Sequence, residues 1–286
     1  MVNTEKFLHV DGLRIRYLEE GRGPDVLLLH GASLGSSADV WERSLAPLAD
    51  YGFRTIAFDQ PGFGLSDDPP DYSVAYRERF IPKFMDALNI EKAHLVGHSQ
   101  AGRIAVSLAL KDPARIAKVV VLGTGTLLPP LGDGEKQTGP TEGDGGTISE
   151  PTLDDTRALL QADLFNHSLI TPEVLETRHR MSLGKNFRAF GERRRADQPG
   201  EREALWQRLD QVPVPMLMIY GSNDRGSAAE RTRVAKKRSP ALNLHVLDRC
   251  KHLIQWDAHS EFLALTADFL AGGVLPEGAA SLSRRR

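Results

Sequence analysis

The chain has 286 residues, of which 41% are hydrophobic, so it is long enough for one large α/β domain with an insertion. Its 36 basic and 38 acidic residues nearly cancel, which argues against a nucleic-acid-binding protein. The single cysteine, Cys250, excludes an intrachain disulfide framework, and the sequence contains no signal core and no apolar run of 18 residues. We therefore expect a cytoplasmic protein that acts on a small molecule, without a nucleic-acid or membrane partner.

Short apolar runs alternate with helical patterns over residues 1–128, the first part of the expected core. Strands at 7–10 and 14–18 are expected to form a hairpin that turns at Asp11 and Gly12. Further strands are expected at 26–29, 55–58, 93–96 and 119–122, and helices at 38–51, 73–88 and 101–110. Continuous apolar strands that alternate with helices predict an α/β fold with a parallel sheet covered on both faces.

The alternation stops over residues 129–211. Residues 129–150 are rich in glycine, proline and acidic residues and are expected to form a loop. The pattern is then only helical, at 153–165, 173–183 and 187–195, which predicts a lid over the carboxyl edge of the sheet. The arginine run 193–195 is expected to be solvated.

The strand and helix alternation resumes over residues 212–272, which complete the core. Strands are expected at 216–220 and 244–247, and helices at 228–237 and 260–270. Residues 273–286 are expected to form a flexible tail that ends in a second solvated arginine run, 284–286.

The segment Leu95–Gly102 joins the strand at 93–96 to the helix at 101–110 through a turn of small residues. Strand, sharp turn and helix are the setting that a G-x-S-x-G nucleophile elbow requires. Glycine flanks allow the strained turn, and the helix N-terminus favours developing negative charge. Ser99 is therefore the predicted nucleophile.

A serine nucleophile needs a base and an orienting acid, which follow it along the chain as Asp and then His in this kind of fold. His252 lies in the loop after the last predicted strand, and Asp224 follows the strand at 216–220. The other common place for the acid, after residues 119–122, has no carboxylate. We assign His252 as base and Asp224 as acid, and expect Asp248 and Asp257 to be loop and cap residues.

Two backbone N–H groups are needed to stabilise the oxyanion. Gln100, the residue after the nucleophile, is expected to supply one, and Ala32 the other, with Gly31 and Ser33 as alternatives. His30 is expected either to orient this loop or to pack under the sheet as a turn residue. No metal or nucleotide motif occurs, so we expect no metal and no cofactor.

From about residue 7 to residue 271 the chain resembles the α/β-hydrolase fold, which implies an eight-stranded, mostly parallel sheet with a helical lid. Within that superfamily it resembles the meta-cleavage-product hydrolases. Three stretches carry the likeness. Cys250–Asp257 is similar to the family's C-G-H-W-x-Q-W-E, and Ser168–Glu173, with Glu176–Arg178 downstream, is similar to the family's lid segment. The third stretch, Asp59–Asp67, matches a loop common to the whole superfamily.

The resemblance implies cleavage of a carbon–carbon bond in a 2-hydroxy-6-oxo-2,4-dienoate. It implies that Arg178 binds the substrate carboxylate, for which the alternative is a solvated helix arginine. Ser33, His98 and Trp256 are the other substrate-binding residues that we expect.

Some residues depart from the family pattern around the reacting centre. His98 replaces an asparagine, Leu253 replaces a tryptophan, and residues 31–35 lack the usual proline. An esterase, lactonase or thioesterase acting on an apolar or aromatic substrate therefore stays open, as does a non-catalytic binding protein of the same fold. The oligomeric state, including a homodimer or higher homo-oligomer, is open as well.

Overall fold

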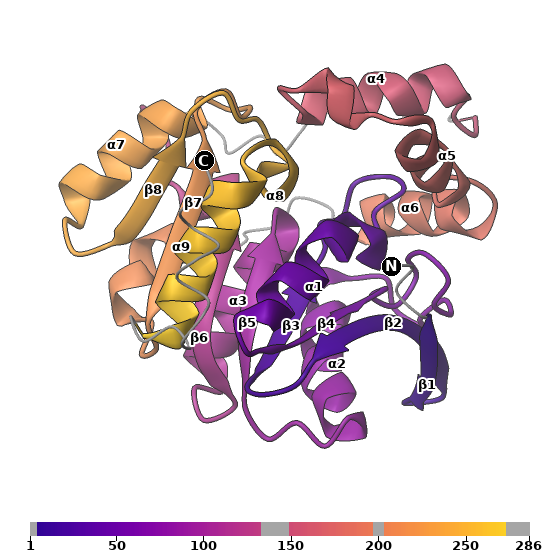
Figure 1. Ribbon diagram of the computed structural model, residues 1–286, viewed down its shortest axis with the longest axis horizontal. Coiled ribbons are helices and arrows are strands. Elements are labelled where there is room, and N and C mark those ends of the chain that lie inside the picture. The colour runs from indigo at the N-terminus through magenta and orange to yellow at the C-terminus, as the bar shows by residue number, and fades with distance from the viewer. Residues whose placement is uncertain (1–4, 133–148, 197–202, 273–286) are drawn as a thin grey trace.

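The computed structural model describes residues 5–132, 149–196 and 203–272. In this part of the chain eight strands form one sheet, in the order β1-β2-β4-β3-β5-β6-β7-β8 (Figure 1). β2 is antiparallel to both of its neighbours, β1 and β4, and all other pairs are parallel, which confirms the mostly parallel sheet. The strands are β1 (Lys6–Val10), β2 (Leu13–Gly21), β3 (Asp25–Leu29), β4 (Arg54–Phe58), β5 (Ala93–His98), β6 (Ile116–Leu122), β7 (Met216–Gly221) and β8 (Asn243–Leu247).

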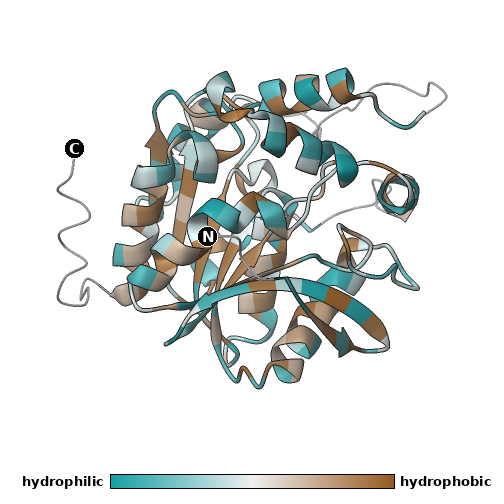
Figure 2. Cartoon of the chain, turned by 45° about the vertical axis from the view of Figure 1, so that its right-hand side comes forward, coloured by the Kyte–Doolittle hydropathy of each residue, from teal (hydrophilic) through white to brown (hydrophobic). Residues whose placement is uncertain are grey.

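Helices cover both faces of the sheet because successive strand residues point to opposite sides. Leu27 and Leu29 belong to a buried cluster with residues of α2 (Val74–Ala87), α3 (Gln100–Lys111) and α7 (Ala228–Arg238). Val26 and Leu28 belong to a second cluster with α1 (Glu42–Asp50), α8 (Ile254–Asp257) and α9 (His259–Ala271). Figure 2 shows the hydrophobic residues concentrated in the central strands between these two layers.

Local sequence explains two details of the first half of the chain. Asp11 and Gly12 have φ angles of 53° and 81°, so the β1–β2 hairpin turns through two positive-φ residues, as expected for a tight hairpin. The helix expected at 38–51 is divided into the 3₁₀ turn η1 (Ala38–Trp41) and α1. The N–H of Ala38 donates to the carboxylate of Asp59 at 2.6 Å, a tertiary contact that holds the first turn against another loop.

Between β6 and β7 the described residues contain helices and no strand. They form η2 (Gly125–Leu127), α4 (Leu153–Asp163), η3 (His167–Leu169), α5 (Pro172–Arg180), α6 (Lys185–Ala196) and η4 (Leu205–Gln211). Thr152 and Asp155 form a capping box at the start of α4, and Thr171 caps α5, whose first residue is Pro172. We call residues 153–196 the helical insertion; Figure 1 shows its three α helices together beside the sheet.

Parts of the predicted organisation lie outside the described residues. These are 133–148 of the expected loop, 197–202 of the region 129–211, and the expected tail 273–286. The division into core, lid and tail stays a prediction. No helix in the described ranges has the length and apolar character needed to cross a membrane.

Candidate active site

Ser99 lies at the sharp turn between β5 and α3. Its backbone has φ 56° and ψ −125°, a conformation that residues other than glycine rarely adopt. A Cβ atom on Gly97 would lie 2.5 Å from the Ala101 carbonyl oxygen, and one on Gly102 would lie 2.1 Å from Thr124 Oγ1. The chain thus has the strained turn expected of an elbow, although Ala101 stands where the strict pattern has its second glycine.

Asp224 and His252 are paired at the same edge of the sheet. His252 Nδ1 lies 3.1 Å from Oδ1 and 3.2 Å from Oδ2 of Asp224, and both side chains are buried. Since a carboxylate only accepts hydrogen bonds, Nδ1 carries the proton in this contact. In the neutral ring, Nε2 is then the nitrogen that can accept a proton from a nucleophile.

The loop after β6 packs against this pair. Gly123 has a φ of 57°, and a Cβ atom on it would lie 3.2 Å from Asp224 Oδ2 and 3.3 Å from His252 Nδ1. The alternative location for the acid, the loop after β6, therefore holds Gly123, which has no side chain and packs against the Asp224–His252 pair.

His98 is buried and contacts the backbone of His252. Its Nε2 donates to the His252 carbonyl at 2.9 Å, and the two ring centroids are 4.7 Å apart. Burial, followed by the neighbouring imidazole, holds the pKa of His98 well below its usual value, so the ring is a neutral donor. The structure thus gives His98 a contact with the candidate base, whereas we had expected one with the substrate. The two residues are 154 positions apart, and no sequence pattern indicated their contact.

The expected oxyanion loop is held by His30. The ring donates from Nδ1 to the Gly31 carbonyl at 2.7 Å, and Nε2 accepts from the N–H of Gln60 at 3.0 Å. Burial lowers the pKa of His30 to about 3, so it is neutral, as these two bonds require. In a planar trans peptide C=O and N–H point in opposite directions. His30 therefore sets the direction of the Ala32 N–H, as the first of its two expected roles requires.

Gly31 also contacts the candidate nucleophile. A Cβ atom on Gly31 would lie 3.1 Å from the Cβ atom of Ser99, so the loop after β3 and the elbow touch at this point. Gln100, the other expected oxyanion residue, begins α3, and its backbone N–H lies at the positive end of the helix dipole. Both expected donors thus belong to segments adjacent to Ser99.

Two buried arginines lie near the elbow. Arg77 donates to the side-chain oxygen of Gln100 and lies 5.3 Å from the centroid of the Phe63 ring. Arg193, from α6, lies 3.7 Å from the same centroid and donates to the Gly62 carbonyl at 2.6 Å. The expectation that residues 193–195 form a solvated run is wrong for Arg193, which is 4% exposed. Because α6 packs on the loop after β4, the guanidinium of Arg193 points into the protein.

Arg178 of α5 reaches the oxyanion loop. Its Nη2 donates to the Ser33 hydroxyl at 2.9 Å, so the guanidinium lies next to the residue that follows Ala32. Together with Arg77 and Arg193 it adds, after burial, to the lowering of the pKa of His30. The surroundings of the loop are therefore electropositive and favour an anionic ligand.

A cavity of about 140 Å³ opens between α5 and the start of α1. Arg178 and Trp256 both line it, and the Trp256 indole N–H donates to the Val40 carbonyl at 2.7 Å. Leu253, the neighbour of His252, also lines the cavity, whereas Ser99 is not among its described lining residues. The structure thus joins Arg178 to Ser33 by a hydrogen bond and places Arg178 and Trp256 in one cavity, which reaches the candidate base only through its neighbour Leu253.

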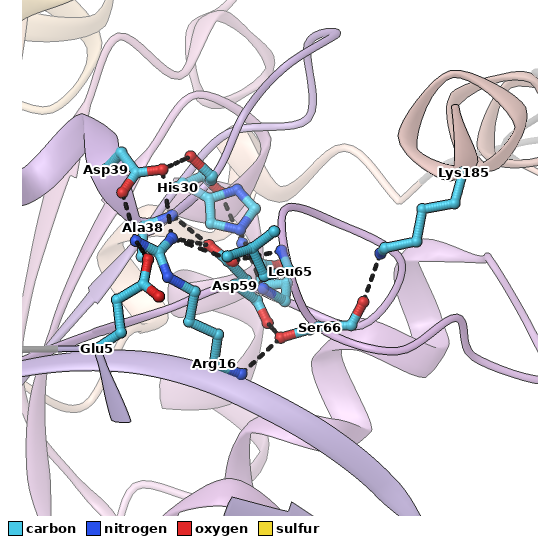
Figure 3. Close-up of polar contacts among 11 residues, drawn as sticks. Glu5, Arg16, His30, Ala38, Asp39, Asp59, Leu65, Ser66 and Lys185 are labelled. Carbon is cyan, nitrogen blue, oxygen red and sulfur yellow. Dashed lines mark hydrogen bonds and ion pairs between the residues drawn. The ribbon is translucent and has the colours of Figure 1, made fainter. Parts of the chain in front are cut away.

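Sequence reasoning missed the buried charges under the oxyanion loop (Figure 3). Asp59 accepts from the N–H of Ala38 at 2.6 Å and of Leu65 at 2.8 Å, and lies 3.3 Å from Arg16 Nη1. Burial raises the pKa of Asp59 to about 6. Arg16 also pairs with Asp39 at 2.6 Å. The only signal was the alternation of arginine with apolar residues over 14–17 in β2, which does not identify such distant partners.

The loop 59–67, which begins with Asp59, also binds the helical insertion. Lys185 Nζ donates to the Ser66 carbonyl at 2.5 Å, also visible in Figure 3. With the Arg193 bond to Gly62, this contact fixes α6 at both ends to the loop 59–67. Within the described residues no group of three or more His, Cys, Asp or Glu side chains is placed to hold a metal ion.

The sheet order, the strained turn at Ser99 and the loop-borne Asp224–His252 pair are the arrangement of an α/β hydrolase. A family model described as alpha/beta hydrolase fold matches residues 24–141. The 2-hydroxy-6-oxononadienedioate/2-hydroxy-6-oxononatrienedioate hydrolase of Comamonas testosteroni is 32% identical over 94% of this chain and 97% of its own. The 2-hydroxy-6-oxo-6-phenylhexa-2,4-dienoate hydrolase of Burkholderia cepacia is 31% identical, with the same coverage.

Solved structures agree with these relatives. The meta-cleavage product hydrolase of Pseudomonas fluorescens IP01 superposes with a TM-score of 0.74 at 26% identity, covering 94% of this chain and 98% of that one. The chain belongs to the α/β hydrolases of the meta-cleavage-product hydrolase family.

Proposed function

We propose that the protein hydrolyses its substrate with Ser99 as nucleophile, His252 as general base and Asp224 as orienting acid. The contact of Asp224 with Nδ1 supports this assignment, because it presents Nε2 as the proton acceptor. The strained backbone of Ser99 supports the role of nucleophile, because an elbow exposes its hydroxyl at a strand end. Ala32 and Gln100 supply the oxyanion N–H groups.

The substrate is a 2-hydroxy-6-oxo-2,4-dienoate, the class named in the relatives. The position of Arg178 is the observation that favours this substrate class. Its guanidinium, 2.9 Å from Ser33 Oγ, can bind a carboxylate in bidentate fashion beside the oxyanion loop. The other guanidinium groups near His30 also favour an anion over a neutral ester. Ser33 and Trp256 border the carboxylate end of the substrate.

The reaction begins when the dienol ketonises, which prepares the bond between C5 and C6 for cleavage. Ser99 Oγ then bonds to the C6 carbonyl carbon as His252 Nε2 takes the hydroxyl proton, and the oxyanion accepts from Ala32 and Gln100. When the C5–C6 bond breaks, the electron pair passes to the dienoate fragment, which takes the proton held on His252 Nε2 and leaves as 2-hydroxypentadienoate. Water activated by His252 then releases the acyl group from Ser99 as a carboxylic acid.

A spectroscopic screen tests this proposal. Ring-opened dienoates absorb in the visible or near-ultraviolet and bleach when the carbon–carbon bond is cut. We expect bleaching of these compounds to be faster than hydrolysis of chromogenic esters, and to disappear in Ser99→Ala. Turnover of esters alone would replace the proposal by an esterase, lactonase or thioesterase with the same triad. Binding without turnover of any substrate would indicate a non-catalytic protein.

We also propose that the protein works in the cytoplasm. The single thiol, Cys250, is free and buried in the described structure, as suits a reducing compartment. Fractionation of cells that produce the protein would test this location.

A further inference from the structure

The carboxylate of Asp257 joins the helical insertion to the loop that carries His252. Oδ2 accepts from the N–H of Phe165 at 2.8 Å and from that of Lys251 at 2.9 Å. Oδ1 accepts from the N–H of Asn166 at 2.9 Å. One side chain at the end of α8 therefore satisfies two backbone donors of the insertion and one donor next to His252.

The other neighbour of His252 is bound to the same part of the insertion. The N–H of Leu253 donates to the Asp163 carbonyl at 3.0 Å, at the end of α4. The side chain of Asp163 lies 3.4 Å from Arg225, the residue that follows Asp224. The turn 163–166 thus contacts the loop of the candidate acid and the backbone of Leu253 directly, and it is linked to the backbone of Lys251 through the Asp257 carboxylate.

His252 is also held by contacts outside the insertion. Its carbonyl accepts from His98, and its ring contacts Asp224. The contact of Lys251 with Asp257 and that of Leu253 with Asp163 add to this support. Because a catalytic ring must be held within a fraction of an ångström, loss of this support moves Nε2 relative to Ser99.

We propose that Asp257 is a positioning residue that couples the helical insertion to the geometry of His252. The inference rests on the proposed role of His252 as general base. It assigns Asp257 more than the cap role expected from sequence, because two of its three backbone partners, Phe165 and Asn166, belong to a distant segment. Only an ionised carboxylate offers acceptors on both oxygens, whereas an amide would turn an NH₂ group towards one set of N–H donors.

Asp257→Asn and Asp155→Asn form a matched pair of variants. Asp155 also caps the insertion, but its capping hydrogen bonds are with Thr152 at the start of α4 and not with the loop of His252. Both variants should lose some thermal stability. Only Asp257→Asn should lower kcat for a p-nitrophenyl ester, by about tenfold or more, while KM changes little. It should lower the rate at which a sulfonyl fluoride modifies Ser99 to the same degree.

Asp257→Glu keeps the carboxylate and should recover part of the lost kcat, also if the asparagine variant folds poorly. Equal kcat values for wild type and Asp257→Asn, or equal losses in Asp155→Asn, would overturn the positioning role alone. A wild-type protein whose Ser99 does not react would overturn the proposed triad, and with it this inference.

Discussion

His252 Nδ1 lies 3.1 Å from Oδ1 of Asp224, and the two residues come from loops that follow neighbouring parallel strands, β8 and β7. Parallel pairing brings the carboxyl ends of these strands to one edge of the sheet, so residues 28 positions apart meet there. This contact fixes which ring nitrogen of His252 carries the proton, and the proposed chemistry depends on it.

Asp224→Asn should remove the contact that keeps the proton of His252 on Nδ1. An asparagine can donate to Nδ1, which favours the tautomer with the proton on Nε2 and leaves no base for Ser99. We expect kcat for any substrate to fall by about 10⁴-fold with a small change in KM. Asp248→Asn, an exposed acid of the next loop, is the control and should keep wild-type kcat. Comparable losses in both variants would remove Asp224 from its role.

Ser99→Ala should abolish turnover and leave binding intact. Loss of the nucleophile lowers kcat by roughly 10⁶-fold in enzymes that use a triad. Because Arg178 is unchanged, the dienoate should still bind, which a shift in its absorption spectrum on mixing would report. Turnover near the wild-type rate would show that the mechanism does not use Ser99.

Arg178→Ala should separate anionic from neutral substrates. A hydrogen bond to a charged group contributes about 1.5–3 kcal/mol, so KM for a dienoate should rise by about tenfold to a hundredfold. KM for a neutral p-nitrophenyl ester should change little. Arg180→Ala, an exposed arginine of the same helix, is the matched control. Equal effects of Arg178→Ala on both substrates would contradict a carboxylate contact.

The sequence predicted the sheet because its buried strands have a clear local signal. The runs 26–29 and 119–122 are continuous and apolar, the run 93–96 is interrupted only by His94, and each lies within an observed strand. The order of strands and helices also placed Ser99, Asp224 and His252 at strand ends, where loops meet. These features depend on neighbouring residues, so a single sequence is sufficient to identify them.

The contacts that hold the candidate site residues in place could not be predicted, because they join residues that are distant in the sequence. The His98 contact with His252 spans 154 positions, and Asp257 contacts residues 91 and 92 positions away. Arg193 was interpreted as solvated because its neighbours are arginines, but the packing of α6 buries it. Local pattern determines where a chain forms elements, whereas tertiary packing decides which polar side chains become buried.

Acid should destabilise the protein through its buried histidines. Burial lowers the pKa of His94 to about 4, so the folded state resists a proton that the unfolded chain takes up near its ordinary value of 6.5. The stability from neutral His94 is complete above pH 6.5 and is lost as pH falls towards 4. In that range the free energy of unfolding should fall by up to about 1.4 kcal/mol per pH unit for this group.

Urea unfolding at several pH values would measure this slope. His94→Gln removes the titrating ring and should give a shallower fall between pH 6.5 and 4 than the wild type. His94 packs against Phe53, away from the triad, so the comparison does not depend on activity. Identical slopes for the two proteins would contradict a lowered pKa at this position.

Gly123→Ala should lower both stability and activity. The residue has a φ of 57°, where a side chain costs about 1–2 kcal/mol of backbone strain. Its new methyl group would lie 3.2 Å from Asp224 Oδ2 and 3.3 Å from His252 Nδ1, tighter than ordinary contact, so the acid and base must shift by a few tenths of an ångström. We expect kcat to fall by about tenfold or more, measured well below the melting temperature. Gly125→Ala is the control, because a Cβ atom there would lie 3.6 Å from its nearest neighbour, Arg231 Nη1. If Gly123→Ala lost stability but kept kcat, the loop after β6 would be a structural neighbour of the pair that does not determine its geometry.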